Sequence, residues 1–410
     1  MQSIEITSLL AQQIKKKSQQ LDSFFADRFT QSPALFYNSV DIRNSGFKIS
    51  AVDTNCFPAG FNNLAPISIS AAQKQAHIFL EKNFPNTKNI LIIPESHTRN
   101  LNYLENIRSL QRILESSYNV KIGTLISEIT SATEFKTALG NEIDLHPIIK
   151  NKDRLELANF MPDVIILNND LSEGLPQIFD NCSTPIIPST KIGWYNRSKF
   201  AHFTKYNEIA TEIAAILEVD PWLISAICDI SSNINFKERS GIEDLSQKVE
   251  NLLAKISQKY QEFNINKSPY CFVKADSGTY GMAVWRVTSA SDILAINKKD
   301  RNKMSVTKGS IQNTRVIIQE GIPTTSKIDN IPAESMIYMI GGEVMADLFR
   351  VNDTRDDLSS LNSAGAKFYD GADLDYSRIV PQYKGNNLSV VNELISKIAA
   401  LASSQEIAKL

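Results

Sequence analysis

The sequence predicts a mixed α/β and α+β protein, in which an N-terminal domain with an open parallel sheet precedes a second half of antiparallel strands and helices. The first half contains short apolar strands followed by polar loops and helical spacing, the repeating unit of a parallel sheet. The second half contains apolar runs that flank glycine turns, which favours antiparallel hairpins. A chain of 410 residues is long enough for two or three domains, each with its own core.

Composition narrows the class of protein. The 43 Lys and Arg residues nearly balance the 45 Asp and Glu residues, so no overall charge favours nucleic acid or an anionic membrane. The four cysteines are far apart and form no CxxC pair, which indicates reduced thiols. No apolar run reaches membrane-spanning length, and the N-terminus lacks the pattern of a signal peptide. We therefore expect a cytoplasmic protein that binds neither nucleic acid nor membranes, and its oligomeric state stays open.

The N-terminal region begins with residues 3–30, whose apolar positions recur at helical spacing and predict an amphipathic helix. Residues 36–63 show neither helical nor strand periodicity, and their polar side chains are interleaved with aromatic residues and glycines. Because burying such groups unpaired costs roughly 1 to 3 kcal/mol each, they pair either with one another in turns or with a ligand such as a zwitterionic amino acid. The cluster consists of Asp41, Arg43, Lys48, Asp53, Asn55, Asn62 and Asn63.

Residues 90–94, 120–126 and 163–167 are predicted to be strands of the parallel sheet. His97 and Arg99 follow the first of them, at the end of the strand where ligands gather in such sheets. A helix cap or a solvent-exposed position is the alternative for His97. We place the end of this N-terminal domain at residue 190. The second half, 191–410, divides into a largely helical part, 191–265, and a part with antiparallel strands, 266–410.

The pattern of residues 269–287 is strand, glycine loop, strand, and Lys274 lies inside the first strand. Glycines let backbone N–H groups approach phosphate oxygens, and the ammonium group supplies a point charge, so a phosphate site is one interpretation. An edge strand whose lysine reaches solvent above an ordinary hairpin is the other.

Further along, residues 316–323 form a brief strand that ends at Gly and Pro, and residues 335–340 and 344–351 flank a Gly341-Gly342 turn. A two-residue turn would place Glu334 opposite Phe349. Glu334 and Arg350 therefore share a face only if the hairpin contains a bulge. A polar loop over 352–367 and a closing helix over 389–405 complete the chain.

Several segments, taken together and in their order along the chain, resemble ATP-grasp ligases and in particular the proteobacterial glutamate-cysteine ligase family. They include Lys199 in GWYNRSKFAHF, Lys274 in VKADSGTYGMAV and the strand led by Glu334, together with DIRNSGFKISAVDTNCFPAGFNNL, IPESHTRNLNYLE and VIILNNDLSEG. The resemblance implies that the second half is an ATP-grasp module of two α+β subdomains, with ATP between Lys199 and Lys274. It also implies a loop over the phosphates, Ser277, Gly278, Thr279, Tyr280 and Gly281, and an adenine site at Gln319, Glu320, Gly321 and Ile322.

The same resemblance implies that Arg350 and the two lysines neutralise the transferring phosphoryl group and that Mg²⁺ binds Glu334. Most ATP-grasp enzymes carry a further Glu-x-Asn on a late strand, and no apolar strand after residue 366 ends that way. We therefore add Asp347 and Asn362 as candidate metal ligands. The polar cluster of residues 41–63, with His97, Arg99 and Arg197, is the candidate site for the amino-acid substrates.

The implied activity is ATP-dependent formation of γ-glutamylcysteine from glutamate and cysteine through γ-glutamyl phosphate, the first step of glutathione biosynthesis. Two alternatives remain open at this point. One is an ATP-grasp ligase that joins a different carboxylate and amine. The other is a catalytically silent nucleotide-binding regulatory protein. No covalent enzyme intermediate is needed, so the cysteines are not expected to act as nucleophiles.

Overall fold

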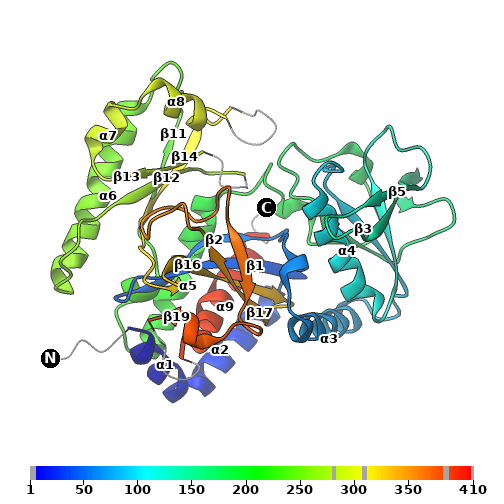
Figure 1. Cartoon of the computed structure of the whole chain (residues 1–410), viewed down its shortest axis with the longest axis horizontal. Coiled ribbons are helices and arrows are strands. Elements are labelled where there is room, and N and C mark those ends of the chain that lie inside the picture. The colour runs from blue at the N-terminus through cyan, green and yellow to red at the C-terminus, as the bar shows by residue number, and fades with distance from the viewer. Residues whose placement is uncertain (1–5, 279–282, 307–311, 382–386, 408–410) are drawn as a thin grey trace.

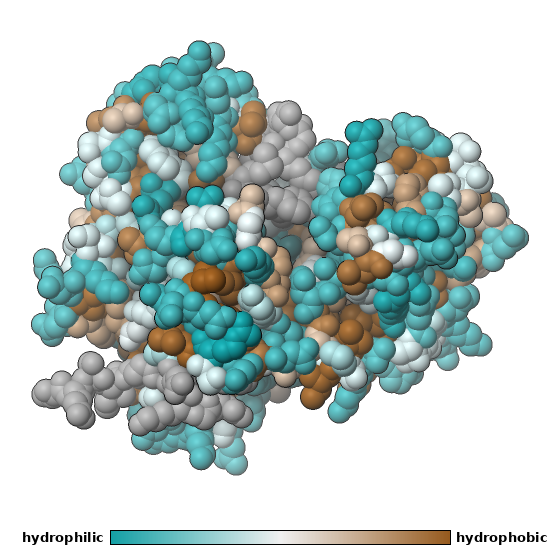
Figure 2. Space-filling model, in the orientation of Figure 1, coloured by the Kyte–Doolittle hydropathy of each residue, from teal (hydrophilic) through white to brown (hydrophobic). Residues whose placement is uncertain are grey.

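The computed structural model describes residues 6–278, 283–306, 312–381 and 387–407. In this part of the chain a central body carries two lobes, each built on its own sheet (Figure 1). The visible face is largely hydrophilic, and a notch separates the two lobes above the central body (Figure 2). None of the helices in the described residues is long and apolar enough to cross a membrane.

The central sheet combines strands from both ends of the chain. Its order is β18-β17-β16-β1-β2, with β15 and β19 attached at the side of β16. The bounds are β1 (Tyr37–Asn44), β2 (Ile49–Asn55), β15 (Lys327–Ile328), β16 (Ile331–Ile340), β17 (Glu343–Val351), β18 (Lys367–Asp370) and β19 (Ile379–Val380). β1 pairs antiparallel with both β2 and β16, so the pairing crosses the domain boundary expected at residue 190.

The position of β1 explains why residues 36–63 show no periodicity. Both of its edges are paired, and all but one of its residues are buried, so apolar and polar positions do not alternate. One face of the central sheet packs against helices: α1 (Ile6–Lys16), α2 (Ser18–Gln31), α5 (Lys199–Leu217) and α9 (Asn387–Ile407). The amphipathic helix expected over residues 3–30 is therefore two helices, which meet at Lys17.

The second sheet forms the lobe at the right of Figure 1, and its order is β10-β9-β3-β4-β6-β5. Its central strands are parallel, which confirms the three strands expected in the first half. The bounds are β3 (Asn89–Pro94), β4 (Asn119–Thr124), β5 (Thr133–Lys136), β6 (Glu142–Pro147), β9 (Val164–Asn168) and β10 (Ile186–Ile187), with α3 (Pro66–Asn83) and α4 (Leu101–Glu115) beside them. A small hairpin, β7 (Ile149–Asn151) and β8 (Arg154–Glu156), stands apart from this sheet.

The third sheet is antiparallel and forms the upper left lobe of Figure 1. Its order is β11-β14-β12-β13, and the pairing of β12 with β13 confirms the hairpin expected over residues 269–287. The bounds are β11 (Cys228–Ser232), β12 (Cys271–Ala275), β13 (Val284–Val287) and β14 (Arg315–Glu320), with α6 (Ile242–Glu262), α7 (Ala290–Leu294) and α8 (Lys298–Met304). The four cysteines are free thiols, as their spacing predicted.

Candidate functional site

Two cavities meet on the face of the central sheet that is turned away from α9. The first, here called the cleft, has a volume of about 690 Å³ and lies between the central sheet, the third sheet and the start of α5. The second, here called the chamber, has a volume of about 1490 Å³ and lies between the central sheet and the parallel-sheet lobe. The two share three lining residues, Asp41, Asp53 and Asn362. We call this shared boundary the junction.

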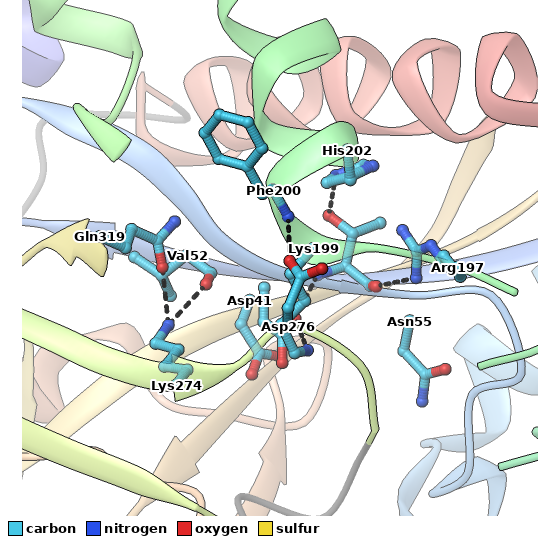
Figure 3. Close-up of polar contacts among 12 residues, drawn as sticks. Asp41, Val52, Asn55, Arg197, Lys199, Phe200, His202, Lys274, Asp276 and Gln319 are labelled. Atoms are coloured by element: carbon cyan, nitrogen blue, oxygen red, sulfur yellow. Dashed lines mark hydrogen bonds and ion pairs between the residues drawn. The ribbon is translucent and has the colours of Figure 1, made fainter. Parts of the chain in front are cut away.

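Two lysines from different parts of the fold converge on the cleft, as the resemblance implies. Lys199 is the first residue of α5, whose N-terminus is capped by the side chain of Ser198, and its Nζ lies 2.8 Å from Asp53 Oδ1. Lys274 lies on β12 and donates to the backbone oxygen of Val52 at 3.1 Å and to Gln319 Oε1 at 2.7 Å. Figure 3 shows both lysines among their partners.

The environment of Lys274 weakens its hold on a proton. Burial lowers the pKa of its ammonium group to about 8; the carboxylate of Asp53 offsets part of this effect, and Lys199 adds to it. A triphosphate in the cleft would bring negative charge to both lysines and restore the protonated form. Lys274 therefore gains from an anionic ligand in the cleft.

The two lysines are held in a fixed relation by Asp276, a residue that the sequence reasoning did not single out. Its backbone oxygen accepts from Lys199 N at 2.7 Å, and its Oδ1 accepts from Phe200 N at 2.8 Å. Asp276 therefore ties the start of α5 to the end of β12, only two residues beyond Lys274. A buried carboxylate at a helix N-terminus is favoured by the helix dipole and the unpaired N–H groups there.

A buried network of arginines and carboxylates occupies the polar face of the central sheet. Glu334 accepts from Arg43 Nε at 2.7 Å and from Arg350 Nη1 at 2.6 Å, and Arg350 also donates to Asp41 at 2.7 Å. Burial alone would raise the pKa of Glu334, but the two guanidinium groups lower it overall. For Asp41 burial prevails over Arg350, and its pKa is raised.

A bulge in the hairpin brings this network together. β16 and β17 shift register between Tyr338 and Met339, and as a result Glu334 pairs with Arg350 rather than with Phe349. Glu334 and Arg350 therefore share a face, because the hairpin contains the bulge that this arrangement requires. Without the extra residue, Arg350 would point to the face that packs on α9.

The predicted metal ligands do not come together. Glu334 is already bound by two arginines, and Asn362 lines the junction. Asp347 lies on the opposite face of the sheet, where Asn392 of α9 donates to it at 3.4 Å. No group of three or more His, Cys, Asp or Glu side chains suited to a metal occurs among the described residues.

Oxygen donors suited to Mg²⁺ occur instead on β1 and β2. Asp53 and Asn55 are two residues apart on β2, and Asp41 stands directly opposite Asp53 on β1. All three line the chamber, and both carboxylates also line the cleft. Burial would raise the pKa of Asp53, but Lys199 and Lys274 lower it overall, so the carboxylate is held ionised. One or two carboxylates beside a phosphate site are the usual protein ligands of Mg²⁺, so the residues present fit this ion.

Some of the other predicted residues line one of the two cavities and some do not. Those that line the cleft or the chamber are Arg43, Asn62, Asn63, Gly278, Gln319, Glu320 and Ile322. Ser277 precedes Gly278 and is partly buried, while Thr279, Tyr280 and Gly281 lie outside the described residues. Gly321 approaches the ring of Tyr270 so closely that an added Cβ would lie 2.2 Å from it.

Four predicted substrate residues line neither cavity. Lys48 is buried in an ion pair with Glu320 at 2.9 Å, and Arg197 is buried against Glu406 at 2.9 Å. Arg99 is exposed. His97 pairs with Glu95 at 2.5 Å and lines a neighbouring pocket. Lys48 and Arg197 are charged groups whose paired partners come from distant parts of the chain, which a local polar pattern does not reveal.

Some backbone groups of the adenine site implied by the resemblance are already hydrogen-bonded within the protein. The backbone N–H groups of Glu320 and Gly321 donate to Ile227 O and Tyr270 O, both at 2.8 Å. The backbone oxygen of Ile322 accepts from Arg43 at 3.2 Å. Gln319 Nε2, which is buried, has no hydrogen-bond partner within the described structure, and its side chain lines the cleft.

Known proteins resemble this chain along nearly its whole length. The sequence model of the family described as glutamate-cysteine ligase (GshA) matches residues 11–407. A crystal structure from Methylobacillus flagellatus KT, whose protein carries a provisional assignment as gamma-glutamylcysteine synthetase, is 36% identical, with a TM-score of 0.89 over 99% of this chain and 98% of that chain.

A D-alanyl-alanine synthetase A from Vibrio cholerae is 10% identical, with a TM-score of 0.39 over 76% of this chain and 80% of that chain, too low for any inference. None of the curated proteins compared with the chain matches it. The family match spans nearly the whole sequence, and the bacterial structure agrees with it along both chains. The chain therefore belongs to the glutamate-cysteine ligase family, whose members are ATP-dependent ligases that act on small molecules.

Proposed function

We propose that this ligase has an ATP-grasp fold, in which ATP binds in the cleft and glutamate and cysteine bind in the chamber, and that the two half-reactions meet at the junction. The γ-carboxylate of glutamate takes the terminal phosphoryl group of ATP and releases ADP. The amine of cysteine then attacks the γ-carbonyl carbon, phosphate leaves with the C–O bonding electrons, and the amine loses a proton. The product is γ-glutamylcysteine, the first intermediate of glutathione biosynthesis.

The observation that carries this proposal is the junction itself. A nucleotide cleft and a substrate chamber that share Asp41, Asp53 and Asn362 allow a phosphoryl group to pass between ligands without entering solvent. A carboxylate is a poor electrophile, and activation as an acyl phosphate requires this kind of adjacency.

Lys199 and Lys274 bind the phosphates in this proposal. In the structure the ammonium groups of both lysines donate hydrogen bonds to carbonyl or carboxylate oxygens. When ATP binds, phosphate oxygens would replace those acceptors. Arg350 reaches the junction from β17 through its bond to Asp41 and stabilises negative charge on the transferring group. The role of each residue is positioning and charge neutralisation, and no protein nucleophile takes part.

Mg²⁺ would be held by Asp53 and Asn55 of β2, with Asp41 opposite them, and would neutralise phosphate charge when bound. Asp53 and Asn55 form an acid-x-asparagine pair, and in this proposal the pair replaces the Glu-x-Asn motif that the strands after residue 366 lack. Glu334 then keeps Arg43 and Arg350 in place. Asp347 has no part in the metal site.

A coupled assay of ADP release from the purified protein tests the proposed function. Turnover should require glutamate and cysteine together, and each amino acid alone should give only a background rate. Turnover with another amine and no preference for cysteine would point to a different amino-acid ligase. ATP binding without turnover in any amino-acid mixture would leave a nucleotide-binding protein and overturn the proposal.

The metal assignment has its own test in Mn²⁺ binding, measured by electron paramagnetic resonance in the presence of a non-hydrolysable ATP analogue. Asp53→Asn removes a charged oxygen ligand and should weaken Mn²⁺ binding by about tenfold or more. Asp347→Asn is the matched control, because it neutralises a carboxylate on the opposite face of the same sheet. Equal weakening in both variants would contradict the assignment.

A further inference from the structure

A buried cluster of charged side chains joins the start of α5 to the end of α9, and the proposed reaction does not use it. Glu406, in the last turn of α9, accepts from Arg197 Nε at 2.9 Å and from His202 Nδ1. Arg197 and His202 lie beside Lys199 at the start of α5 (Figure 3). None of the three is more than 7% exposed. We call Arg197, His202 and Glu406 the ion cluster.

Two members of the ion cluster hold the same residue of β2. Arg197 Nη1 donates to the backbone oxygen of Thr54 at 2.7 Å, and His202 Nε2 lies 3.0 Å from the Thr54 hydroxyl oxygen. An ionised carboxylate only accepts, so the Nδ1 of His202 donates to Glu406, and this bond orients the ring toward Thr54. Thr54 is therefore fixed through both its backbone and its side chain.

Thr54 stands between Asp53 and Asn55, the proposed Mg²⁺ ligands of β2. Successive side chains of a strand point to opposite faces, so the ion cluster holds β2 from the face opposite these two ligands. The backbone oxygen that Arg197 binds belongs to the peptide group between Thr54 and Asn55. A displacement of this peptide group would move Asn55, and Mg²⁺ accepts only a near-octahedral arrangement of its ligands.

Glu406 also balances the charge of the ion cluster. Burial would raise the pKa of its carboxyl group, but Arg197 and His202 lower it overall, so the carboxylate is held ionised. The Arg197 guanidinium lies 4.7 Å from the ring centre of Trp194, and the Lys199 ammonium lies 4.4 Å from the same ring centre. Without the carboxylate of Glu406, the positive charge of Arg197 would act on the metal site less compensated and would repel a divalent cation.

We infer that Glu406 is a positioning residue for the proposed metal site. Through Arg197 and His202 it holds Thr54, and so it keeps Asp53 and Asn55 in the arrangement that Mg²⁺ requires. This inference rests on the proposed function. Glu406 would not contact the ion, and its effect would be that of an outer-shell partner, whose loss typically lowers metal affinity by about tenfold to a hundredfold.

Mn²⁺ binding, measured by electron paramagnetic resonance with a non-hydrolysable ATP analogue, tests the inference without turnover. Glu406→Gln keeps the shape of the side chain and removes its charge, so it should weaken Mn²⁺ binding by about tenfold or more. Thr54→Val removes the hydroxyl group that meets His202 and should weaken binding by about fivefold, the scale of one lost hydrogen bond. Thr54→Ser keeps that hydroxyl group and should stay within about twofold of the wild type.

Glu105→Gln is the matched control for the loss of a buried carboxylate. Glu105 belongs to the parallel-sheet lobe, where it accepts from Asn141 at 3.0 Å and from the Thr137 hydroxyl. This variant should have a lower melting temperature and an Mn²⁺ affinity within about twofold of the wild type. In EDTA, the affinity of Glu406→Gln for the ATP analogue should not fall, because the lysines of the cleft and the charge of Arg197 are retained.

Equal weakening of Mn²⁺ binding in Glu406→Gln and Glu105→Gln would mean a general structural effect and overturn the inference. A wild-type Mn²⁺ affinity in folded Glu406→Gln would also overturn it. If melting curves show that Glu406→Gln does not fold, the two Thr54 variants decide, and equal losses in both would overturn the inference.

Asp53→Asn separates this inference from the proposed function on which it rests. Weaker Mn²⁺ binding in Asp53→Asn, with Glu406→Gln unaffected, would remove only the positioning role of Glu406. A wild-type protein that binds no Mn²⁺ with the ATP analogue would remove the proposed metal site, and the role of Glu406 with it.

Discussion

At the scale of single residues, the two lysines of the proposed nucleotide cleft have different hydrogen-bond partners. Lys274 donates to two neutral oxygens, one of which belongs to the backbone of Val52. Neutral acceptors compensate an ammonium group less than a carboxylate does. Lys199, in contrast, has the carboxylate of Asp53 at 2.8 Å. The two lysines therefore differ in the charge of their acceptors.

Lys274→Ala should lower kcat/KM for ATP by about a hundredfold or more, because a transition-state charge contact is lost. The pKa of about 8 also predicts that the affinity of the wild type for an ATP analogue falls as the pH rises through that value, since deprotonation removes the charge. Lys274→Arg keeps the charge and should abolish this alkaline decrease. Calorimetric titrations between pH 7 and 9.5 measure both effects, and the same decrease in the arginine variant would contradict the assignment to Lys274.

At the scale of elements, the two faces of the β16–β17 hairpin have different surroundings: one faces the cavities and the other packs against α9. Glu334 and Arg350 face the cavities, and Asp347 faces α9. Burial raises the pKa of Asp347 to about 7; the bond from Asn392 opposes this rise, and the nearby Asp370 adds to it. Its Oδ1 has no partner among the described residues.

Because the folded pKa of Asp347 lies above its usual value of about 3.8, the contribution of this group to stability is complete below that value and is lost as the pH rises through about 7. Asp347→Asn imitates the protonated carboxyl group. The variant should have a higher free energy of unfolding than the wild type above pH 7, by an amount on the order of 1–3 kcal/mol. The difference should vanish near pH 4. Urea denaturation at several pH values measures it, and a difference independent of pH would exclude Asp347 as its source.

At the scale of the whole molecule, the central sheet joins residues that are about three hundred positions apart. β1 is paired with β16 from Tyr37 opposite Ile340 to Ile42 opposite Ser335. The buried residues around α9 also come from both ends of the chain. The parallel sheet of the first half is therefore inserted between strands of a single larger sheet, and a cut at residue 190 divides that sheet.

We expect residues 191–410, expressed alone, to show no cooperative thermal unfolding. β16 would lose its central neighbour, and the apolar surface that meets β1 would be open to water. Co-expression of 1–190 with 191–410 should restore a cooperative transition, measured by circular dichroism. A cooperative transition of the isolated fragment would show that the boundary expected from the sequence separates autonomous units.

Local patterns in the sequence determined the parallel strands of the first half, the hairpin that carries Lys274, the turn at Gly341-Gly342 and the closing helix. Each depends on neighbours within about twenty residues, where periodicity and turn chemistry act directly. The resemblance placed Lys199 and Lys274 together, and the structure brings both to the cleft.

Tertiary structure alone decided the rest. A strand buried on both faces has no alternation, so β1 was invisible in the pattern, and with it the opposition of Asp41 and Asp53. Asp347 carries a carboxylate suited to a metal, but the face of the sheet on which it lies depends on a strand register that includes a bulge. Asn106 is an ordinary polar helix residue by its sequence, and only packing at the chamber buries its amide nitrogen with no acceptor among the described residues. Strand pairing over long separations and the burial of single atoms are consequences of packing, and no local pattern encodes them.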